Sequence, residues 1–296
     1  MAVTLEQAKL NVQDDLQLGV IDEFRKSTWL FDNLIFDDVV SATGGGATLT
    51  YAYTRLKTQP TAGFRNVNEE YATSEVEKQR FTADLKIFGG GFKVDRVIAN
   101  MGGIADEVAL QMAQKIKAAG ALFNDTVING DSAVDSKSFD GLEKALKGSS
   151  TEYKPAAAID LSTSEAVTKN FQAFLDALDE FLMTLDGKPS FIGGNTKLIA
   201  KLRACARRAG MYQVTKDSFG NQVESYGGIP FVDFGSKPGT NDDVVKTETT
   251  GETSLYAARI GLDGFHGISM AGQPPVKTWL PDFATAGAVK EGEVEI

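Results

Sequence analysis

Residues suited to acid–base or nucleophilic catalysis are scarce in this sequence of 296 residues. The one histidine, His266, lies in the run Gly264-Phe265-His266-Gly267, and the one cysteine, Cys205, lies between two alanines. A lone histidine leaves little room for a histidine-based catalytic group or metal site. Cys205 falls in a segment with helical apolar spacing, so we expect a small buried core residue rather than a nucleophile. A single cysteine also rules out an internal disulfide.

Glycine-rich runs and grouped acids do not complete a known site either. The triple-glycine runs at 44–46 and 89–91 lack the following Lys-Ser or Lys-Thr of a phosphate-binding loop, so we interpret them as corners between elements. The acids at 131–135 do not have the spacing of a calcium-binding loop. The sequence therefore predicts no catalytic residue, no cofactor and no metal site.

One basic cluster stands out in a chain whose formal net charge is −10. Its members fall on one predicted helix: Lys201, Arg203, Arg207 and Arg208. Such a cluster can meet nucleic acid, but in an acidic protein we favour a salt-bridged helix face. Because binding to phosphates needs clustered Lys and Arg, the overall charge argues against broad affinity for nucleic acid. No run is long enough to cross a bilayer, and residues 1–30 lack the order of a signal peptide, so we expect no membrane partner.

The dominant element of the pattern is a long helix within residues 101–130. Its apolar positions recur every four residues, and once after three, so they form one stripe that we predict to be the core face of the helix. The stripe consists of Ile104, Val108, Met112, Ile116, Ala119, Phe123 and Val127. About 25 residues at 1.5 Å each would span roughly 38 Å. Asp106 near the start and Asn129-Gly130 at the end are typical of helix boundaries.

A segment without a core of its own precedes this helix. Within residues 48–96, apolar and polar residues alternate over 49–56 and 81–85, which predicts two strands, and the residues between them are polar. A two-stranded excursion is marginal in water, so it should need a partner surface. Before it, the apolar strip 29–36 favours an extended arm, within residues 1–46, that must pack against something.

After the long helix the sequence predicts a mixed lobe. Ser162 with Glu165 is typical of a capping box that opens a helix, and Asn195 is expected to cap another. Short buried strands are predicted at 190–192, 229–232 and 254–260. This mixture of helices and strands indicates the α+β class.

The order of these parts resembles the tailed-bacteriophage major capsid protein of the Hong Kong 97 type. The run GGGFKVDRV at 89–97 is similar to the segment that enters the long helix in that family, and NGD at 129–131 with FDGL at 139–142 is similar to its exit. The resemblance covers essentially the whole chain and implies the phage major capsid fold. The implied parts are an N-terminal arm at 1–46, an extended two-stranded E-loop at 47–97, a peripheral domain with a long spine helix at 98–145, an α+β axial domain at 146–265 and a return to the peripheral domain at 266–296.

The function that the resemblance implies is that of a structural shell protein and not an enzyme. In that family, copies of one chain assemble in the bacterial host cytoplasm, as hexamers and pentamers, into the icosahedral capsid of a virion that encloses double-stranded DNA. The implied partners are further copies of the chain, a scaffolding protein, a portal, decoration proteins, and packaged DNA that is bound without sequence specificity.

The resemblance also gives roles to particular surfaces. Charged residues of the E-loop are expected to pair with neighbouring subunits: Arg55, Lys57, Arg65, Glu69, Glu70 and Arg80. Three aromatic residues are expected to anchor the arm: Trp29, Phe31 and Phe36. One face of the spine helix should pack on the returning C-terminal strands, and the other should look toward the inside of a shell.

Two further functions stay open on the sequence alone. An encapsulin-like bacterial compartment would use the same fold to enclose a cargo enzyme. An α+β enzyme or ligand-binding protein would use the glycine-rich corners instead, although the lone histidine and the missing motifs argue against it.

Overall fold

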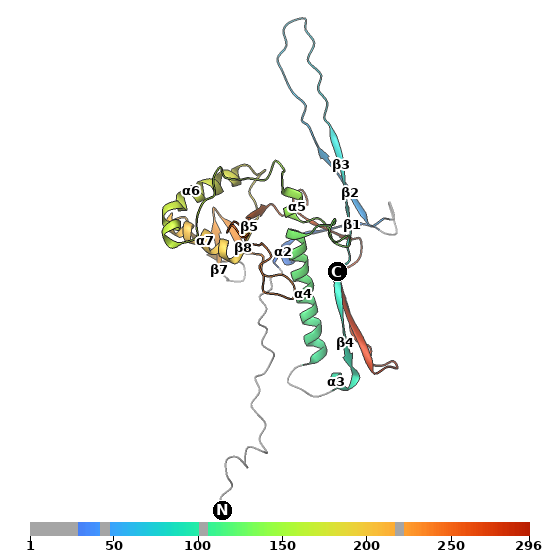
Figure 1. The fold of residues 1–296 in the computed structure, drawn as a ribbon. Helices are drawn as coiled ribbons and strands as arrows, with labels where there is room; N and C mark the ends of the chain where they lie inside the picture. Colours follow the sequence, from blue (N-terminus) through green and yellow to red (C-terminus); the bar gives the residue numbers. More distant parts are fainter. Residues whose placement is uncertain (1–28, 42–47, 101–105, 217–221) are drawn as a thin grey trace, which may run out of the picture.

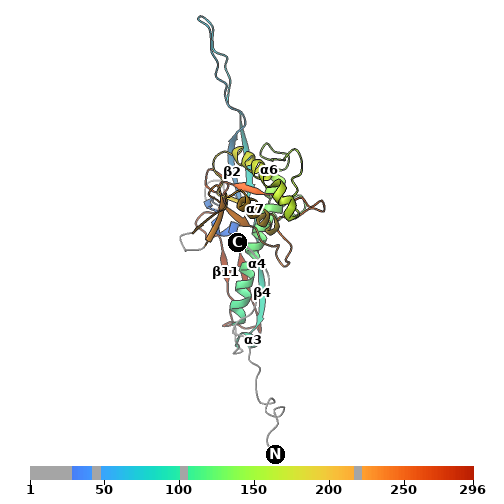
Figure 2. The same cartoon turned by 90° about the vertical axis from the view of Figure 1, so that its left-hand side faces the viewer.

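The computed structural model describes residues 29–41, 48–100, 106–216 and 222–296. Figure 1 shows three parts: a lobe built on a five-stranded sheet, a straight spine around the long helix, and a hairpin that rises away from both. The second view shows the hairpin and the spine extending in opposite directions, and the first shows the lobe to one side of the spine (Figures 1 and 2). Helices and strands share the chain, so the predicted α+β class is confirmed.

The spine consists of helix α4 (Glu107–Asn129) and the sheet on which it packs. Asp106 caps the helix, because its side chain accepts hydrogen bonds from the backbone N–H groups of Val108 and Ala109. The sheet has the order β11-β12-β4, with antiparallel pairing of β11 (Lys277–Trp279), β12 (Val289–Glu295) and β4 (Gly89–Asp95). The predicted packing of the long helix on the returning C-terminal strands is confirmed.

A small apolar core joins α4 to this sheet. Met112 is buried with Phe92, Val94 and Val294, and Val108 packs against the group. Strand β4 therefore belongs to the spine, whereas the sequence placed all of 48–96 in the coreless excursion. That boundary was wrong because Phe92 and Val94, which point to one side of the strand, are covered by the helix. The short helix α3 (Arg96–Asn100) follows β4 directly.

The predicted stripe along α4 departs from the covered face at Ile116. Ile116 is 42 % exposed, whereas Met112, Phe123 and Val127 are buried. The reason is geometric: four residues turn an α-helix by about 40° more than one full turn, so successive steps of four rotate away from a fixed face. The step of three residues from Ile116 to Ala119 returns the stripe to the covered face of the helix, and Ala119 is buried. Ile104 lies outside the described residues.

The lobe contains a five-stranded sheet of order β6-β7-β8-β5-β9. Its strands are β6 (Gln213–Lys216), β7 (Gln222–Tyr226), β8 (Ile229–Asp233), β5 (Phe191–Gly194) and β9 (Tyr256–Ala258). Strands β5 and β8 are parallel, and the other pairs are antiparallel. Helices α6 (Ser164–Met183) and α7 (Thr196–Arg208) pack on each other, and α7 contacts β5 and β8.

The caps of these two helices test the sequence predictions. Asn195 caps α7 as predicted, with its Oδ1 accepting from the N–H of Leu198 at 2.8 Å. The predicted cap Ser162 was wrong by one residue, since Thr163 is the N-cap of α6 and accepts from the N–H of Ala166. Both hydroxyl residues suit a cap, and the backbone path decides between them.

The arm residues that the structure describes form regular elements and not an extended strip. Helix α2 (Trp29–Asn33) is a single turn, closed by a hydrogen bond from the N–H of Leu34 to the carbonyl of Leu30 at 2.8 Å. It is followed by β1 (Phe36–Val40), which pairs in parallel with β10 (Gly267–Met270). The remaining short helix, α5 (Leu142–Leu146), packs on α4. The prediction of an extended strip was wrong, because the aromatic residues of this strip pack into two different clusters. A helical turn directs their side chains toward both clusters.

We predict that Met112→Ala destabilises the unassembled subunit by about 2–5 kcal/mol, because it opens a cavity between α4 and its sheet. Ile116→Ala on the same helix is the matched control, and its cost should be smaller, about 1 kcal/mol, because Ile116 is 42 % exposed whereas Met112 is buried. Urea unfolding followed by circular dichroism measures both. Equal losses would contradict the placement of the two side chains.

Candidate assembly surfaces

The long hairpin, residues 48–86, contains no buried residue. Strands β2 (Thr50–Leu56) and β3 (Lys78–Asp84) pair antiparallel, with Tyr53 opposite Phe81. Beyond them the two limbs continue without regular strand structure and reach far from the body (Figure 1). A few hydrogen bonds hold these limbs together, such as that from the N–H of Thr61 to Ser74 Oγ at 2.8 Å. The hairpin therefore has ordered geometry and no hydrophobic core.

One face of the hairpin carries a stacked aromatic row near its base. Tyr51, Tyr53 and Phe81 stack in sequence, with ring centroids 6.1 Å and 5.7 Å apart. The guanidinium of Arg55 continues the row, 5.6 Å from the Tyr53 ring and 5.4 Å from the Phe81 ring. Cation–π and stacking contacts of this kind stiffen a two-stranded ribbon that no core supports. Arg55, predicted as an assembly residue, thus contacts its own hairpin in the free subunit.

The tip of the hairpin is a turn organised by two of the predicted assembly residues. The Glu69 carboxylate accepts hydrogen bonds from the backbone N–H and the side-chain Nδ2 of Asn66. Arg65 donates to the carbonyls of Asn66 and Glu69, and its guanidinium lies 5.2 Å from the Tyr71 ring. Asn68 adopts a left-handed conformation with φ of 71°, which asparagine tolerates better than most residues. The tip is thereby held in one shape while Phe64 and Val67 remain exposed to solvent.

The other charged residues predicted for assembly lie on the exposed limbs. Lys57 forms an ion pair with Glu77 at 3.2 Å, and both side chains are largely in solvent. Such a surface pair contributes little stability. Glu70 and Arg80 are exposed. The hairpin therefore offers charge and apolar surface outward, and the structure does not bring its charged residues together into one site.

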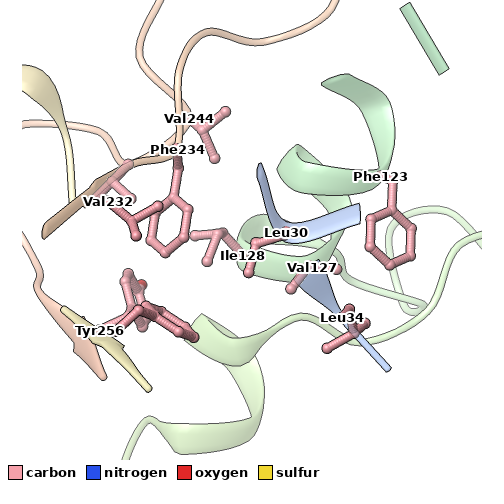
Figure 3. Close-up of a cluster of buried hydrophobic side chains, with 11 residues drawn as sticks. Leu30, Leu34, Phe123, Val127, Ile128, Val232, Phe234, Val244 and Tyr256 are labelled. Atoms are coloured by element: carbon pink, nitrogen blue, oxygen red, sulfur yellow. The ribbon is translucent and has the colours of Figure 1, made fainter. Parts of the chain in front are cut away.

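The three predicted arm anchors all reach the central apolar core of the molecule. The Trp29 ring packs edge-on against Phe191 of β5, with centroids 5.2 Å apart. Phe31 and Phe36 contact Phe123 of α4, at 5.3 Å and 6.1 Å. The core around them contains residues from α2, α4 and the five-stranded sheet, and several of these are drawn in Figure 3.

The NGD and FDGL motifs form a junction where the spine helix ends. Asn129 Nδ2 donates to the carbonyl of Val244 at 2.8 Å, which ties the helix end to the lobe. The N–H of Gly141 donates to the carbonyl of Gly130 at 2.8 Å. A Cβ on Gly130 would lie 2.2 Å from the carbonyl oxygen of Phe139, so the two motif segments approach too closely for a side chain there. The motifs were identified in the sequence by resemblance alone, and the close approach of their backbones was not predicted.

Charged side chains brace the same junction. Lys144 Nζ donates to Asp131 at 2.6 Å and to Asp140 at 2.8 Å, and Asp140 also accepts from the N–H and hydroxyl of Ser132. The hydrogen bonds from Lys144 hold the pKa of each aspartate below its ordinary value. Lys86, at the base of the hairpin, donates to the carbonyl of Ser136 in the loop between the motifs at 3.2 Å. The junction thus connects the helix, the lobe and the hairpin.

The basic cluster on α7 is engaged within the lobe. Lys201 donates to the carbonyl of Ser162, and Arg208 donates to Ser164 and Thr168. Arg203 forms an ion pair with Glu224, and the guanidinium of Arg207 lies 6.0 Å from the centre of the Tyr212 ring. The predicted salt-bridged face is thus present at Arg203, whereas Lys201, Arg207 and Arg208 contact uncharged groups of the lobe.

Within the ranges that the structure describes, no three side chains of the His, Cys, Asp and Glu types are grouped so as to hold a metal ion. None of the helices in these ranges is long and apolar enough to cross a membrane. Cys205 is buried, and its desolvation raises the pKa of the thiol, which disfavours the thiolate.

We predict that Lys144→Met lowers the melting temperature at neutral pH, because two aspartates lose their shared donor. The depressed pKa values mean that this stabilisation is complete above about pH 4, the ordinary carboxyl range, and is lost as the pH falls through the folded values. The difference in melting temperature between the wild type and the variant should therefore become smaller below about pH 4. Melting curves from pH 7 to pH 2 measure it, and a gap that stays constant would contradict the junction as described.

Comparison with known proteins identifies the fold. No protein-family model matches the sequence, and no curated protein matches it significantly. Solved structures do match. The holo-SrpI encapsulin complex of Synechococcus elongatus PCC 7942 is 16 % identical with a TM-score of 0.62, over 100 % of this chain and 90 % of that one. A structure from Mycobacterium phage Bobi is 14 % identical with a TM-score of 0.58, over 100 % and 90 %.

The capsid of a native GTA particle is 16 % identical to the chain with a TM-score of 0.55, over 100 % of this chain and 92 % of that one. Identities at this level are evidence for the fold and not for a particular function. The likeness covers the hairpin, the spine and the lobe together, since the whole chain is spanned. The chain therefore has the α+β fold of the Hong Kong 97-type capsid proteins.

Proposed function

We propose that this chain is the structural, non-enzymatic subunit of an icosahedral bacteriophage capsid. Copies would assemble as hexamers and pentamers, enclose double-stranded DNA and form the shell of the virion after assembly in the bacterial host cytoplasm. The observation that carries the proposal is the long hairpin, which has no buried residue and exposes Phe64 and Val67 at an ordered tip. A monomer gains nothing from such an excursion, whereas a second copy can cover it.

The proposed parts follow the predicted division with one adjustment. The arm comprises 1–46, the E-loop is the hairpin at 48–86, and the axial domain comprises 146–265. The peripheral domain combines 98–145 and 266–296 with β4, because that strand lies in the spine sheet. In the assembly, the E-loop of one copy would lie over a neighbour, with its charged residues at the contact and one face of α4 toward the interior.

The proposed partners follow from the same assignment. The main partner is the chain itself, and a scaffolding protein, a portal and decoration proteins would act at assembly and at the finished surface. The formal net charge of −10 suits contact with packaged DNA without sequence-specific binding, since clustered basic side chains would be needed for tight binding. The contacts of Lys201 and Arg203 with their own lobe support this.

The second candidate is an encapsulin-like bacterial compartment that encloses a cargo enzyme. The observation in its favour is the similarity to the Synechococcus encapsulin complex, at a TM-score of 0.62 over the whole chain. Both candidate functions require assembly of a shell, and they differ in what the shell encloses. A genomic neighbour that encodes a portal or a terminase would favour the capsid, and an enclosed enzyme would favour the compartment.

The proposal predicts that purified protein assembles into closed particles, alone or with a scaffolding protein. Size-exclusion chromatography with light scattering, followed by electron microscopy, measures this. Nuclease-protected DNA or scaffold inside the particles would support the capsid, and a co-purified enzyme inside them would support the compartment. A stable monomer that stays unassembled across salt concentrations and scaffold additions would overturn both.

We also predict that Glu70→Lys leaves the subunit folded but reduces the yield of particles at least several-fold, because a reversed charge at a contact introduces repulsion. Glu70→Gln is the matched control. It removes the charge without reversing it, so its particle yield should lie between those of the wild type and Glu70→Lys. Circular dichroism establishes folding, and light scattering measures assembly. Wild-type yield from Glu70→Lys would remove Glu70 from the predicted contact residues.

A further inference from the structure

We infer that helix α2 sets the angle between the spine and the lobe, and through it the curvature of the shell. The first part of this inference concerns the single subunit. The second part rests on the proposed function, since only an assembled shell has a curvature. The evidence is the way in which the rings of α2 divide between two aromatic clusters.

The first cluster surrounds Phe123 on the spine. Its ring lies 5.3 Å from Phe31, 5.9 Å from Phe88 and 6.2 Å from Phe139, measured between centroids. Phe88 connects the hairpin to β4, and its backbone exchanges two hydrogen bonds with Ile296, of 2.8 Å and 3.1 Å. This cluster therefore fixes the base of the hairpin relative to the spine helix.

The second cluster surrounds Phe191 on the five-stranded sheet. Its ring lies 5.2 Å from Trp29 and 5.9 Å from Phe234, and Phe234 lies 6.3 Å from Tyr256. Gly193 of the same strand has no space for a side chain, because a Cβ there would lie 2.2 Å from the Phe234 ring. This cluster belongs to the lobe, because Phe191 and Tyr256 lie on strands of its sheet.

Helix α2 contributes one ring to each cluster. Trp29 and Phe31 are two residues apart, and two steps of about 100° place their side chains on nearly opposite sides of a helix. Leu30 between them is 0 % exposed. Figure 3 shows Leu30 beside Ile128 and Val127 of α4, with Phe234 and Val244 of the lobe on one side and Phe123 on the other. A rotation of the lobe relative to the spine must therefore displace α2.

The polar contacts that join the described residues of the spine and the lobe do not fix an angle by themselves. Asn129 donates to the carbonyl of Val244, and Lys246 lies 4.0 Å from Glu143 in an exposed ion pair. One hydrogen bond fixes a point rather than an orientation, and an exposed ion pair contributes little. Apolar contacts join the two parts around that point, since Ile128 of α4 lies in one buried core with Phe234 and Val244 of the lobe. Helix α2 adds Trp29 on one side of this core and Phe31 on the other, so its contacts act on the orientation.

The consequence for a shell follows from geometry. Hexamers and pentamers of one chain require the same subunit to fit two local curvatures, and a rotation between spine and lobe is a direct way to provide them. Residues 1–28 precede α2 in the chain, so whatever binds that segment in an assembly also acts on the helix that sets the angle. The geometry points to α2 as the element through which the arm controls curvature.

The test measures a distance across the junction in the free subunit. Spin labels are attached at Ala113→Cys on α4 and Lys169→Cys on α6, two exposed positions, while the native Cys205 is buried and remains unlabelled. Pulsed electron spin resonance then gives the distribution of distances between spine and lobe. Trp29→Leu and Phe31→Leu should each shift the distribution or at least double its width.

Phe181→Leu is the matched control, because its ring packs near Tyr153 in the core of the lobe and not on α2. It should leave the distribution unchanged. Circular dichroism and melting curves establish folding of each variant, and Trp29→Phe, which shortens the ring without removing it, replaces Trp29→Leu if that variant unfolds. Distributions equal to wild type in both the Trp29 and the Phe31 variants would overturn the inference.

Particle diameters test the second part. If wild-type particles form with one diameter, the variants with an altered angle should form particles of several diameters. A single unchanged diameter despite an altered angle would overturn the link to curvature. Failure of the wild type to form particles would instead overturn the proposed function and leave the measured angle of the subunit standing.

Discussion

The fold depends on one shared apolar core, at which elements from three parts of the molecule meet. The last turns of α4 supply Phe123, Val127 and Ile128, the lobe supplies Phe191 and Phe234, and α2 supplies Leu30 between them. Burial of these side chains is the main favourable contribution that holds spine and lobe together. The hairpin has no core and depends on this one through Phe88, which stacks on Phe123.

Polar contacts at the edge of this core select one arrangement out of those that burial alone would permit. The glycines of the NGD and FDGL motifs allow two backbone segments to approach closely, and Lys144 then bridges the aspartates that follow and precede them. In the lobe, Asn195 Nδ2 donates to the carbonyl of Val245 at 3.1 Å while its Oδ1 caps α7. Buried or crowded polar groups of this kind favour specificity, because any other packing would leave them unsatisfied.

Much of this could be predicted from the sequence, because it depends on local patterns. Periodicity gave the long helix and the paired strands of the hairpin, and Asn195 marked a helix start. The failures occurred where distant segments decide the outcome. The strip at 29–36 was expected to be extended, and the partners of Trp29 and Phe31 lie far along the chain at Phe191 and Phe123. The charged residues of the hairpin were predicted as contact residues from their type alone. The internal contacts of Arg65 and Glu69 depend on a turn geometry that no pattern specifies, and those of Arg55 depend on the pairing of β2 with β3.

The pairing of β4 with β12 has a consequence for synthesis on the ribosome. Gly89 pairs with Glu295 and Asp95 with Val289, so the sheet beneath the spine helix combines an early segment with one near the end of this sequence. Contacts between such distant segments form late, and the hairpin emerges long before the strand that completes its base. A nascent or prematurely terminated copy therefore exposes the hairpin without a finished spine to hold it. The register of β12 against β4 thus fixes the direction in which the hairpin leaves the spine, and only a chain translated through β12 contains both strands.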